Sequence, residues 1–488
     1  MSASFMRRQR FLFIALGLLT LWRWALLPTL ELAPGEAAAA LAAGHDAPLV
    51  SWLAKAGTAM FGKGEFGARF FAPLLALLAS LAVWRFTRGL FDPMIAGWAV
   101  VVLNVLPAFN LAAITLTPGT LLFFLTAVAL LCLRTALLHA HPLHGAWFAT
   151  AACAAGAVFA APPGVALMAG ILTALAWPRR LRHHLKAPGF MVIASAWGAA
   201  VLLWAVFQHR NGWPLFETPA WRPALAFVPN LFRWIVLGSP VLLMLVVLVA
   251  RLVAPNAALV GIRAMPLAFL LPMAALDLFY GPWDGWPDTG GAAWLLPAAI
   301  VLAHQGAVFG ALPSEQKISL RTIAIVCAAL QSAFIMQSDL PRTLGLPWRF
   351  TGKVPPHTEW SRFFIAEPSA VMRGWRESAR LFDAALEKAP KAFAVASNAQ
   401  MAAALEFYTR SGVRVWDLVQ ASQGSDAAFR GRDAVFITDD PAATAPPPEL
   451  ARRFASWNLL SVARVMHAGN EVRWLKIFSC HDFRPPEL

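Results

Sequence analysis

Apolar residues fall into long blocks over the first two thirds of the chain, separated by short polar or basic stretches. Each block is roughly 17–25 residues long, which is the length of helix that crosses the hydrocarbon core of a bilayer. Beyond residue 338 the long blocks stop, and charged and turn-forming residues become frequent. The pattern predicts a polytopic α-helical membrane protein over residues 1–338, followed by a separate domain over residues 339–488.

The membrane region is predicted to contain about eleven spans. Their approximate ranges are 10–30, 70–86, 94–113, 118–138, 145–161, 163–178, 188–207, 227–250, 264–280, 291–310 and 322–338. The segments 145–161 and 163–178 meet at Pro162-Pro163. Because proline ends or kinks a helix, these two segments are either two spans or one broken helix.

The tail alternates between strand-like and helical stretches. Strands are predicted at 393–397, 413–418 and 434–438, with two edge-type strands near 460–466 and 472–479. Helices are predicted at 398–408 and 448–457. Alternation of this kind is typical of a small α/β domain.

Composition and charge agree with this division. Of the 488 residues, 59% are hydrophobic and only 14% are charged, whereas a soluble domain carries about 25% charged residues. Short loops rich in Lys and Arg mark the cytoplasmic side of a membrane, and here they fall on one side of the predicted alternation. This places the N-terminus in the cytoplasm and residues 339–488 in the periplasm of a bacterial inner membrane. The loops are Arg7–Arg10, Arg85–Arg88, Arg179–Lys186, Arg251–Arg263 and Lys317–Arg321.

The formal net charge of +14 requires no nucleic acid as a partner. A basic surplus in a membrane protein reports its topology and its contacts with anionic lipid. The sequence has no basic helix and no patch of interleaved basic and aromatic residues, which argues against nucleic-acid binding. The bilayer itself is therefore the first predicted partner.

Short motifs follow one another in order along the chain. The first three are Gly35-Glu36-Ala37, His45-Asp46-Ala47-Pro48-Leu49 and Glu65-Phe66-Gly67-Ala68-Arg69. Later ones are Thr117-Pro118-Gly119-Thr120, Gln208-His209-Arg210-Asn211-Gly212-Trp213 and Trp286-Pro287-Asp288-Thr289. The tail adds Gly374-Trp375-Arg376-Glu377, Glu406-Phe407-Tyr408, Ser422-Gln423 and Gly431-Arg432-Asp433-Ala434.

This order resembles the GT-C glycosyltransferases that are related to the protein O-mannosyltransferases and to the aminoarabinose transferases of lipid A. Members of that bacterial branch read Asp-Glu-Ala-Tyr-Tyr, Asp-His-Pro-Pro-Leu and Glu-Leu-Gly-x-Arg at the first three motifs. The resemblance covers nearly the whole chain. It implies a GT-C fold, a polyprenyl-phosphate-linked sugar as donor, and a site at the boundary between membrane and periplasm.

The implied reaction explains why acidic residues belong in the first exported loop. The acceptor hydroxyl must lose a proton as it attacks the anomeric carbon, and a carboxylate within hydrogen-bond reach can take that proton. Lys, Arg or a divalent cation must hold the leaving phosphate. This chain departs from the family at three places. Gly35 and Gly119 stand where the family carries aspartates, and Ala160-Ala161-Pro162-Pro163 replaces a Ser-Lys-Tyr motif that supplies a lysine.

The remaining polar motif residues each have two interpretations. Glu36 is either a general base moved by one position or a carboxylate favoured by the positive end of a helix dipole. Asp46, beside His45, is either the next candidate base or an ordinary loop residue. Glu65 and Arg69 are either substrate-binding residues or an ion pair four residues apart on a helix. The resemblance adds Gln208 and His209 as substrate-binding candidates.

Two functions follow from the sequence. The first is a membrane glycosyltransferase that modifies a lipid or an envelope glycan on the periplasmic side. The second is a GT-C-fold protein without catalysis, which serves as a structural or lipid-binding subunit of a larger membrane assembly. A fold by itself does not decide between them.

Overall fold

The computed structural model describes residues 3–41, 48–139, 141–160, 162–210, 239, 295–308, 325–333, 372–423, 429–467 and 470–484. The chain divides into two compact units. The first comprises Met1–Leu27, Asp46–Leu53 and Arg69–Leu344, and the second comprises Pro28–His45, Ala54–Ala68 and Gly345–Leu488. The segments that contain Gly35-Glu36 and Glu65 therefore belong to the same unit as the tail.

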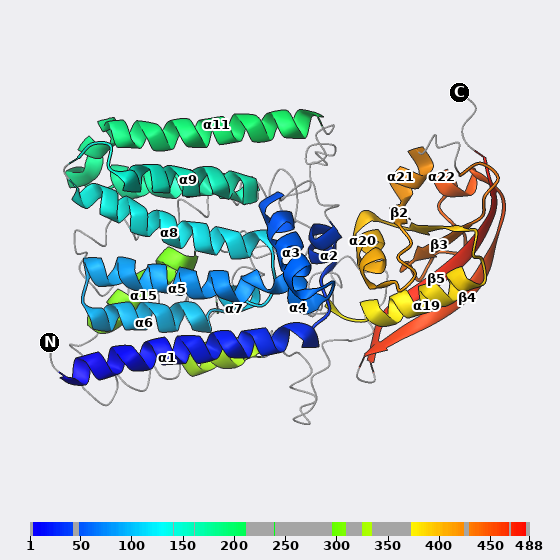
Figure 1. Ribbon diagram of the computed structural model, residues 1–488, viewed down its shortest axis with the longest axis horizontal. Helices are drawn as coiled ribbons and strands as arrows, with labels where there is room; N and C mark the ends of the chain where they lie inside the picture. The colour runs from blue at the N-terminus through cyan, green and yellow to red at the C-terminus, as the bar shows by residue number, and fades with distance from the viewer. Residues whose placement is uncertain are drawn as a thin grey trace. The chain divides into compact units, whose positions relative to one another are not determined.

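The first unit is helical (Figure 1). Its helices are α1 (Ala3–Leu26), α5 (Phe71–Leu90), α6 (Pro93–Val105), α7 (Pro107–Ala112), α8 (Pro118–Leu138), α9 (Gly145–Ala160), α10 (Ala166–Ala176), α11 (Pro188–Arg210) and α15 (Leu295–Val308). Short 3-10 turns lie at η1 (Leu27–Thr29), η2 (Pro162–Val165) and η3 (Arg179–Lys186). Residues 325–333 are also helical. Helix α5 packs against α1, α6 and α8, and α9 packs against α8 and α11.

Four helical stretches in the described part of the chain are long and apolar enough to cross a membrane. They are Arg10–Thr29, Glu65–Leu90, Pro118–Leu138 and Pro188–Phe207. All four coincide with predicted spans, which confirms a helical membrane protein. The predicted spans 227–250 and 264–280 lie outside the described residues, apart from Ser239.

Prolines set the boundaries of several helices. The Asp92 side chain accepts hydrogen bonds from the backbone N–H groups of Met94 at 2.6 Å and Ile95 at 3.0 Å, and Pro93 occupies the first turn of α6. An acidic cap followed by proline is a favourable helix start. The predicted span 94–113 is not continuous, because α6 ends at Val105 and α7 begins at Pro107. Proline in a helix interior would remove a backbone hydrogen bond and clash with the preceding turn.

The segments 145–161 and 163–178 are two helices. A Cβ atom added at Gly164 would overlap the backbone of Ala157. In one straight helix, residues seven apart are separated by about 10 Å along the axis. The chain therefore folds back at η2 against the end of α9, and glycine allows this close approach.

The second unit contains a five-stranded sheet. Its strands are β1 (Phe393–Ala396), β2 (Val415–Asp417), β3 (Ala434–Thr438), β4 (Phe454–His467) and β5 (Asn470–Phe483). The order is β2-β1-β3-β5-β4. Strands β2, β1 and β3 are parallel, whereas β5 runs antiparallel to both β3 and β4.

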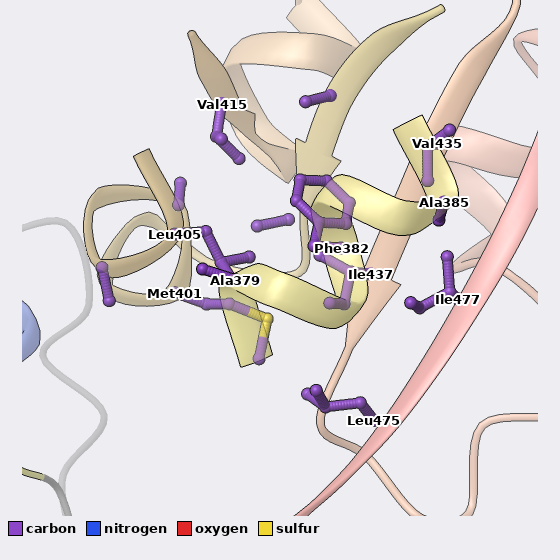
Figure 2. Close-up of a cluster of buried hydrophobic side chains, with 14 of the residues drawn as sticks. Ala379, Phe382, Ala385, Met401, Leu405, Val415, Val435, Ile437, Leu475 and Ile477 are labelled. Carbon is purple, nitrogen blue, oxygen red and sulfur yellow. The ribbon is translucent and has the colours of Figure 1, made fainter. Parts of the chain in front are cut away.

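Helices cover both faces of this sheet. The helices of the unit are α2 (Pro34–Leu41), α19 (Trp375–Glu387), α20 (Ala399–Tyr408), α21 (Leu418–Gln423) and α22 (Pro448–Ala451), and α3 (Pro48–Phe61) and α4 (Glu65–Arg69) cross the boundary between the units. On one face, Phe382 of α19 and Leu405 of α20 pack on β1 and β3, as Figure 2 shows. On the other face, Phe436 and Phe478 share a second core with Ala421 of α21 and Leu450 of α22. The burial of alternate strand residues on opposite faces is the period-2 pattern of a strand covered on both sides.

Two predictions in the tail are wrong. The predicted helix 448–457 stops early, because α22 ends at Ala451 and β4 begins at Phe454, whose side chain is buried in the second core. The strand near 472–479 was expected at an edge, but β5 lies between β3 and β4. Only β4 of this antiparallel pair lies at the edge, which agrees with the mostly exposed side chains along it.

Candidate functional site

Gly35 and Glu36 lie in the first turn of α2, directly after Pro34. Glu36 is buried, with 4% of its surface exposed. Its Oε2 atom accepts a hydrogen bond from the backbone N–H of Ala33 at 3.0 Å. An acidic side chain that reaches back to the residue before the helix satisfies a backbone donor that has no partner within the helix. In this contact Glu36 acts as a helix-capping carboxylate.

Helix α2 packs against α20. Leu32, Ala37, Ala68 and Phe407 form a buried cluster there. Tyr408, at the end of α20, contacts the same cluster and makes two polar bonds. Its hydroxyl accepts from the backbone N–H of Leu32 at 2.6 Å and donates to Oε1 of Glu65 at 3.1 Å. Tyr408 thereby connects the segment before Gly35-Glu36 to the Glu65 motif.

Glu65 also binds Arg376 of α19. The Nε and Nη2 atoms of Arg376 lie 2.9 and 2.5 Å from Glu65 Oε1. Nη2 donates in addition to the backbone oxygen of Pro28 at 3.2 Å. Burial lowers the pKa of the Arg376 guanidinium, but the hydrogen bond and charge of Glu65 outweigh this and raise the pKa above its ordinary value. Glu65 thus favours the charged form of Arg376 within the second unit.

Glu31 and Arg473 extend this charged group around Trp375. The backbone N–H of Trp375 donates to Oε2 of Glu31, and the guanidinium of Arg473 lies 3.4 Å from the centre of the Trp375 ring. Burial lowers the pKa of Arg473 to about 10, and the carboxylates of Asp439 and Glu31 oppose that shift. We call Glu31, Glu65, Arg376, Tyr408 and Arg473 the linking cluster.

Of the candidates from the sequence, Glu36 and Glu65 are brought near each other. Glu36 bonds Ala33, the residue after Leu32, and Leu32 and Glu65 both bond the hydroxyl of Tyr408. Arg69 is fully buried and belongs to the first unit. Gly119 is buried in the first turn of α8, inside a capping box formed by Thr117 and Thr120. His209 is exposed near the end of α11. Asp46 and the side chain of Gln208 lie outside the described residues.

Sequence reasoning did not assign a role to Glu31, Arg376, Tyr408 or Arg473. The signal for two of them was present, because Arg376 lies in the motif Gly374–Glu377 and Tyr408 in the motif Glu406–Tyr408. The structure explains these motifs as contacts between the tail and the Glu65 motif. Across the described residues, no three His, Cys, Asp or Glu side chains are gathered in a way that suits a metal ion.

Comparison with known proteins agrees with the order of the motifs. Residues 45–207 match the family model of dolichyl-phosphate-mannose-protein mannosyltransferases. No curated protein matches the chain.

Two solved structures have the same fold along nearly the whole length of the chain. One is ArnT from Cupriavidus metallidurans in the apo state, with a TM-score of 0.53 and 18% identity, covering 98% of each chain. The other is ArnT from the same organism bound to undecaprenyl phosphate, with a TM-score of 0.50 and 18% identity, again covering 98% of each chain. At this identity the likeness concerns the fold. The family match over residues 45–207 and the shared fold both support the resemblance to GT-C glycosyltransferases that the motifs indicate.

Proposed function

We propose that the protein binds a polyprenyl-phosphate-linked sugar in the bacterial inner membrane and transfers the sugar to a lipid or envelope glycan on the periplasmic side. The observation that carries this proposal is the fold shared with ArnT over 98% of both chains, one of the ArnT structures being bound to undecaprenyl phosphate. The family match over residues 45–207 supports the same donor class, because that family uses a polyprenol-type phosphate sugar by its description.

The chemistry of such a donor suits a polytopic membrane protein. The hydrocarbon tail stays in the bilayer, so the sugar and phosphate must react at its surface. Helices such as Arg10–Thr29 and Pro118–Leu138 supply the spanning scaffold. In the proposed enzyme, Glu36 or Asp46 takes the proton of the acceptor hydroxyl, and Glu65, Arg69, Gln208 and His209 contribute to substrate binding. A divalent cation is a further candidate for holding the phosphate.

A second candidate function is favoured by the geometry of α2. Gly35 carries no side chain where the family has an aspartate, and the neighbouring Glu36 is buried and caps the helix through Ala33. In this position the carboxylate satisfies a backbone donor at the helix start. The second candidate is a GT-C protein that binds a polyprenyl lipid without transferring sugar and acts as a subunit of a membrane assembly.

One experiment separates the two candidates. The full-length protein is purified in a mild detergent, and undecaprenyl phosphate binding is measured by native mass spectrometry. Consumption of undecaprenyl-phosphate-linked sugars is then followed with membrane lipid extracts as acceptors. Binding with consumption supports the transferase. Binding without consumption, together with co-purification of stoichiometric membrane proteins, supports the subunit. A protein that does not bind undecaprenyl phosphate contradicts both.

A further inference from the structure

A second polar group lies in the second unit, away from the linking cluster. Ser479 and His481 are two residues apart on β5, so their side chains point to the same face of the sheet. The Oγ atom of Ser479 lies 3.2 Å from Nε2 of His481, and the Nδ1 atom of His481 lies 3.1 Å from Oδ2 of Asp433. A hydroxyl, an imidazole and a carboxylate are therefore joined in a chain, each within hydrogen-bond distance of the next.

Asp433 is itself held in place. Its Oδ1 atom accepts the backbone N–H of Asp482 at 3.1 Å, while Oδ2 faces His481. Asp482 has a φ of 57°, in the left-handed region that residues with a side chain seldom adopt. Conformations of this kind cluster at functional sites. Asp482 follows His481 directly, and its backbone N–H holds the carboxylate of Asp433, which in turn orients the ring of His481.

An amide completes the group. Asn458 of β4 is the direct partner of Ser479 in the sheet, and its Oδ1 atom lies 3.3 Å from Nε2 of His481. Directly opposed residues of antiparallel strands project to the same face. The amide oxygen of Asn458 therefore lies beside the imidazole, where it can accept a hydrogen bond from the Nε2–H of His481 once that ring has taken the proton of Ser479.

The imidazole and the carboxylate of this group are open to solvent, whereas the hydroxyl is largely buried. The side chains of His481 and Asp433 are 44% and 46% exposed, whereas Ser479 is 6% exposed between two neighbouring strands. The adjacent thiol of Cys480 is buried in the core of the opposite face, and burial raises its pKa to about 12. Of these two neighbouring nucleophiles, only Ser479 has a base within reach.

We propose that Ser479, His481, Asp433 and Asn458 form a serine-hydrolase site on the exported domain, which cleaves acyl esters that project from a large substrate. The open position of His481 suits an ester at the surface of a glycan or lipid headgroup. This inference does not depend on the proposed transfer of sugar. It concerns different residues and a different bond.

The proposed ester hydrolysis uses water as its second substrate. Ser479 Oγ attacks the ester carbonyl carbon while its proton passes to His481 Nε2. The carbon–oxygen bond to the alcohol breaks as that oxygen takes the proton back from the imidazolium, leaving an acyl-serine. Water then gives a proton to Nε2 and attacks the acyl carbon, and Ser479 Oγ leaves with that proton. Ser479 and His481 are catalytic residues, and Asp433 is a positioning residue that holds the ring through Nδ1.

The test uses the full-length protein in detergent with a fluorophosphonate probe, followed by mapping of the modified peptide and by hydrolysis of p-nitrophenyl acetate. Ser479 is expected to carry the label. Ser479→Ala should lose label and hydrolysis, and His481→Ala should lower both by about 10²–10⁴-fold. Asp433→Asn should change the pH profile of hydrolysis, which a merely structural role would leave unchanged. Ser461→Ala, at an exposed serine of β4, is the control and should label normally.

Two results would overturn the proposal. One is a folded wild-type protein that takes no label at Ser479, which needs no variant and so does not depend on how the variants fold. The other is labelling of Ser479 that persists unchanged in His481→Ala, because an unassisted serine would then explain it. Thermal unfolding of each variant, compared with the wild type, identifies loss of fold as the cause of any lost activity.

Discussion

Arg376 donates two hydrogen bonds, from Nε and Nη2, to a single carboxylate oxygen of Glu65, which lies 311 residues away in the sequence. The side chain of Glu65 is 12% exposed and that of Arg376 is 51% exposed. Solvent therefore screens the charge of Arg376, whereas the carboxylate of Glu65 would be left poorly hydrated if the contact were broken. The contact ties an early segment of the chain to helix α19.

Breaking this link is expected to destabilise the second unit. Arg376→Ala removes both of these hydrogen bonds from the carboxylate of Glu65, which costs about 1–3 kcal/mol in the free energy of unfolding. A double-mutant cycle with Glu65→Gln should give a coupling of about 0.5–1 kcal/mol, since half of the arginine remains in water. The measurement is thermal or denaturant unfolding of the purified protein followed by tryptophan fluorescence.

The matched control for this cycle is Glu377 with Arg380, an exposed pair three residues apart on the same helix, joined at 2.6 Å. A surface pair of this kind contributes about 0.3–0.5 kcal/mol. Equal couplings in the two cycles would contradict a linking role for Glu65 and Arg376.

Two glycines of the early motifs are expected to respond oppositely to alanine. A Cβ at Gly67 would overlap the backbone oxygen of Gly62 and lie 3.1 Å from the Cα of Thr58, whereas a Cβ at Gly35 meets no atom within 4 Å. Backbone atoms cannot rotate away, so Gly67→Ala should cost about 1–3 kcal/mol. Gly35→Ala should stabilise α2 by up to about 1 kcal/mol, because alanine favours a helix. Unfolding measurements on both variants check the pair, and similar destabilisation in both would contradict the local geometry.

The sequence predicts those helices and strands whose limits depend on the residues within them. Helix α8 begins at Pro118 and ends at Leu138, as its block of apolar residues predicts, and β3 covers the predicted residues 434–438. The end of α22 was missed because Pro448 and Glu449 favour a helix start, whereas the strand pairing of Phe454 with Phe483 is a tertiary contact. Tertiary packing commonly overrides local propensity.

In the candidate site, too, contacts between residues close in sequence could be predicted, and contacts between distant residues could not. Glu36 as a helix-end carboxylate follows from Pro34 and the alanines after it, and the bond to Ala33 agrees with that interpretation. The bonds of Glu65 to Arg376 and Tyr408 could not be read from the sequence, because no periodicity relates residues 311 and 343 positions apart. For the same reason the group around His481 was missed, since Asp433 and Asn458 reach it only through the pairing of β5 with β3 and β4.

Cys480 is expected to report unfolding of the five-stranded sheet in the second unit. Burial raises the pKa of its thiol from 9.0 to about 12, and the charge of Asp433 adds to the shift. Only the thiolate reacts with maleimides, so alkylation at pH 8 should be slow in the folded protein and fast once denaturant opens the core. Mass spectrometry of the Cys480 peptide follows the reaction. Rapid labelling under native conditions would contradict this burial.

The same shift predicts how stability varies with pH. An acid whose pKa is raised by folding stays protonated in the folded state while the unfolded thiol ionises, so the unfolded state gains stability as the pH rises above about 9. Each pH unit between 9 and the folded value weakens the fold by about 1.4 kcal/mol from this residue. Cys480→Ala should remove that contribution, so the difference in unfolding free energy between wild type and variant should change from pH 8 to pH 10 and stay constant below pH 8.

Membrane topology is expected to follow the basic loops. A reporter enzyme that is active only in the periplasm should be active when fused after Leu488 and inactive when fused after Arg182. The cause is the cluster Arg179, Arg180, Arg182 and Lys186, because short loops rich in Lys and Arg remain in the cytoplasm. The reverse pattern would contradict the predicted sidedness and would separate Glu36 from a periplasmic acceptor.

Glu36 is the position where the capping and catalytic interpretations give different results. Glutamine keeps a side-chain oxygen that can accept the N–H of Ala33, so Glu36→Gln should change the unfolding free energy by less than about 0.5 kcal/mol, whereas Glu36→Ala should cost about 0.5–2 kcal/mol. A general base behaves differently, since glutamine cannot take a proton, and loss of the base lowers the rate of transfer by about 10²–10⁴-fold.

Sugar transfer is therefore measured for the wild type, for Glu36→Gln, and for Glu387→Gln, a control at an exposed carboxylate at the end of α19. A stable Glu36→Gln protein that loses transfer while the control keeps it identifies Glu36 as the base. Full transfer by Glu36→Gln would restrict Glu36 to capping the helix, and Asp46 would become the carboxylate to test.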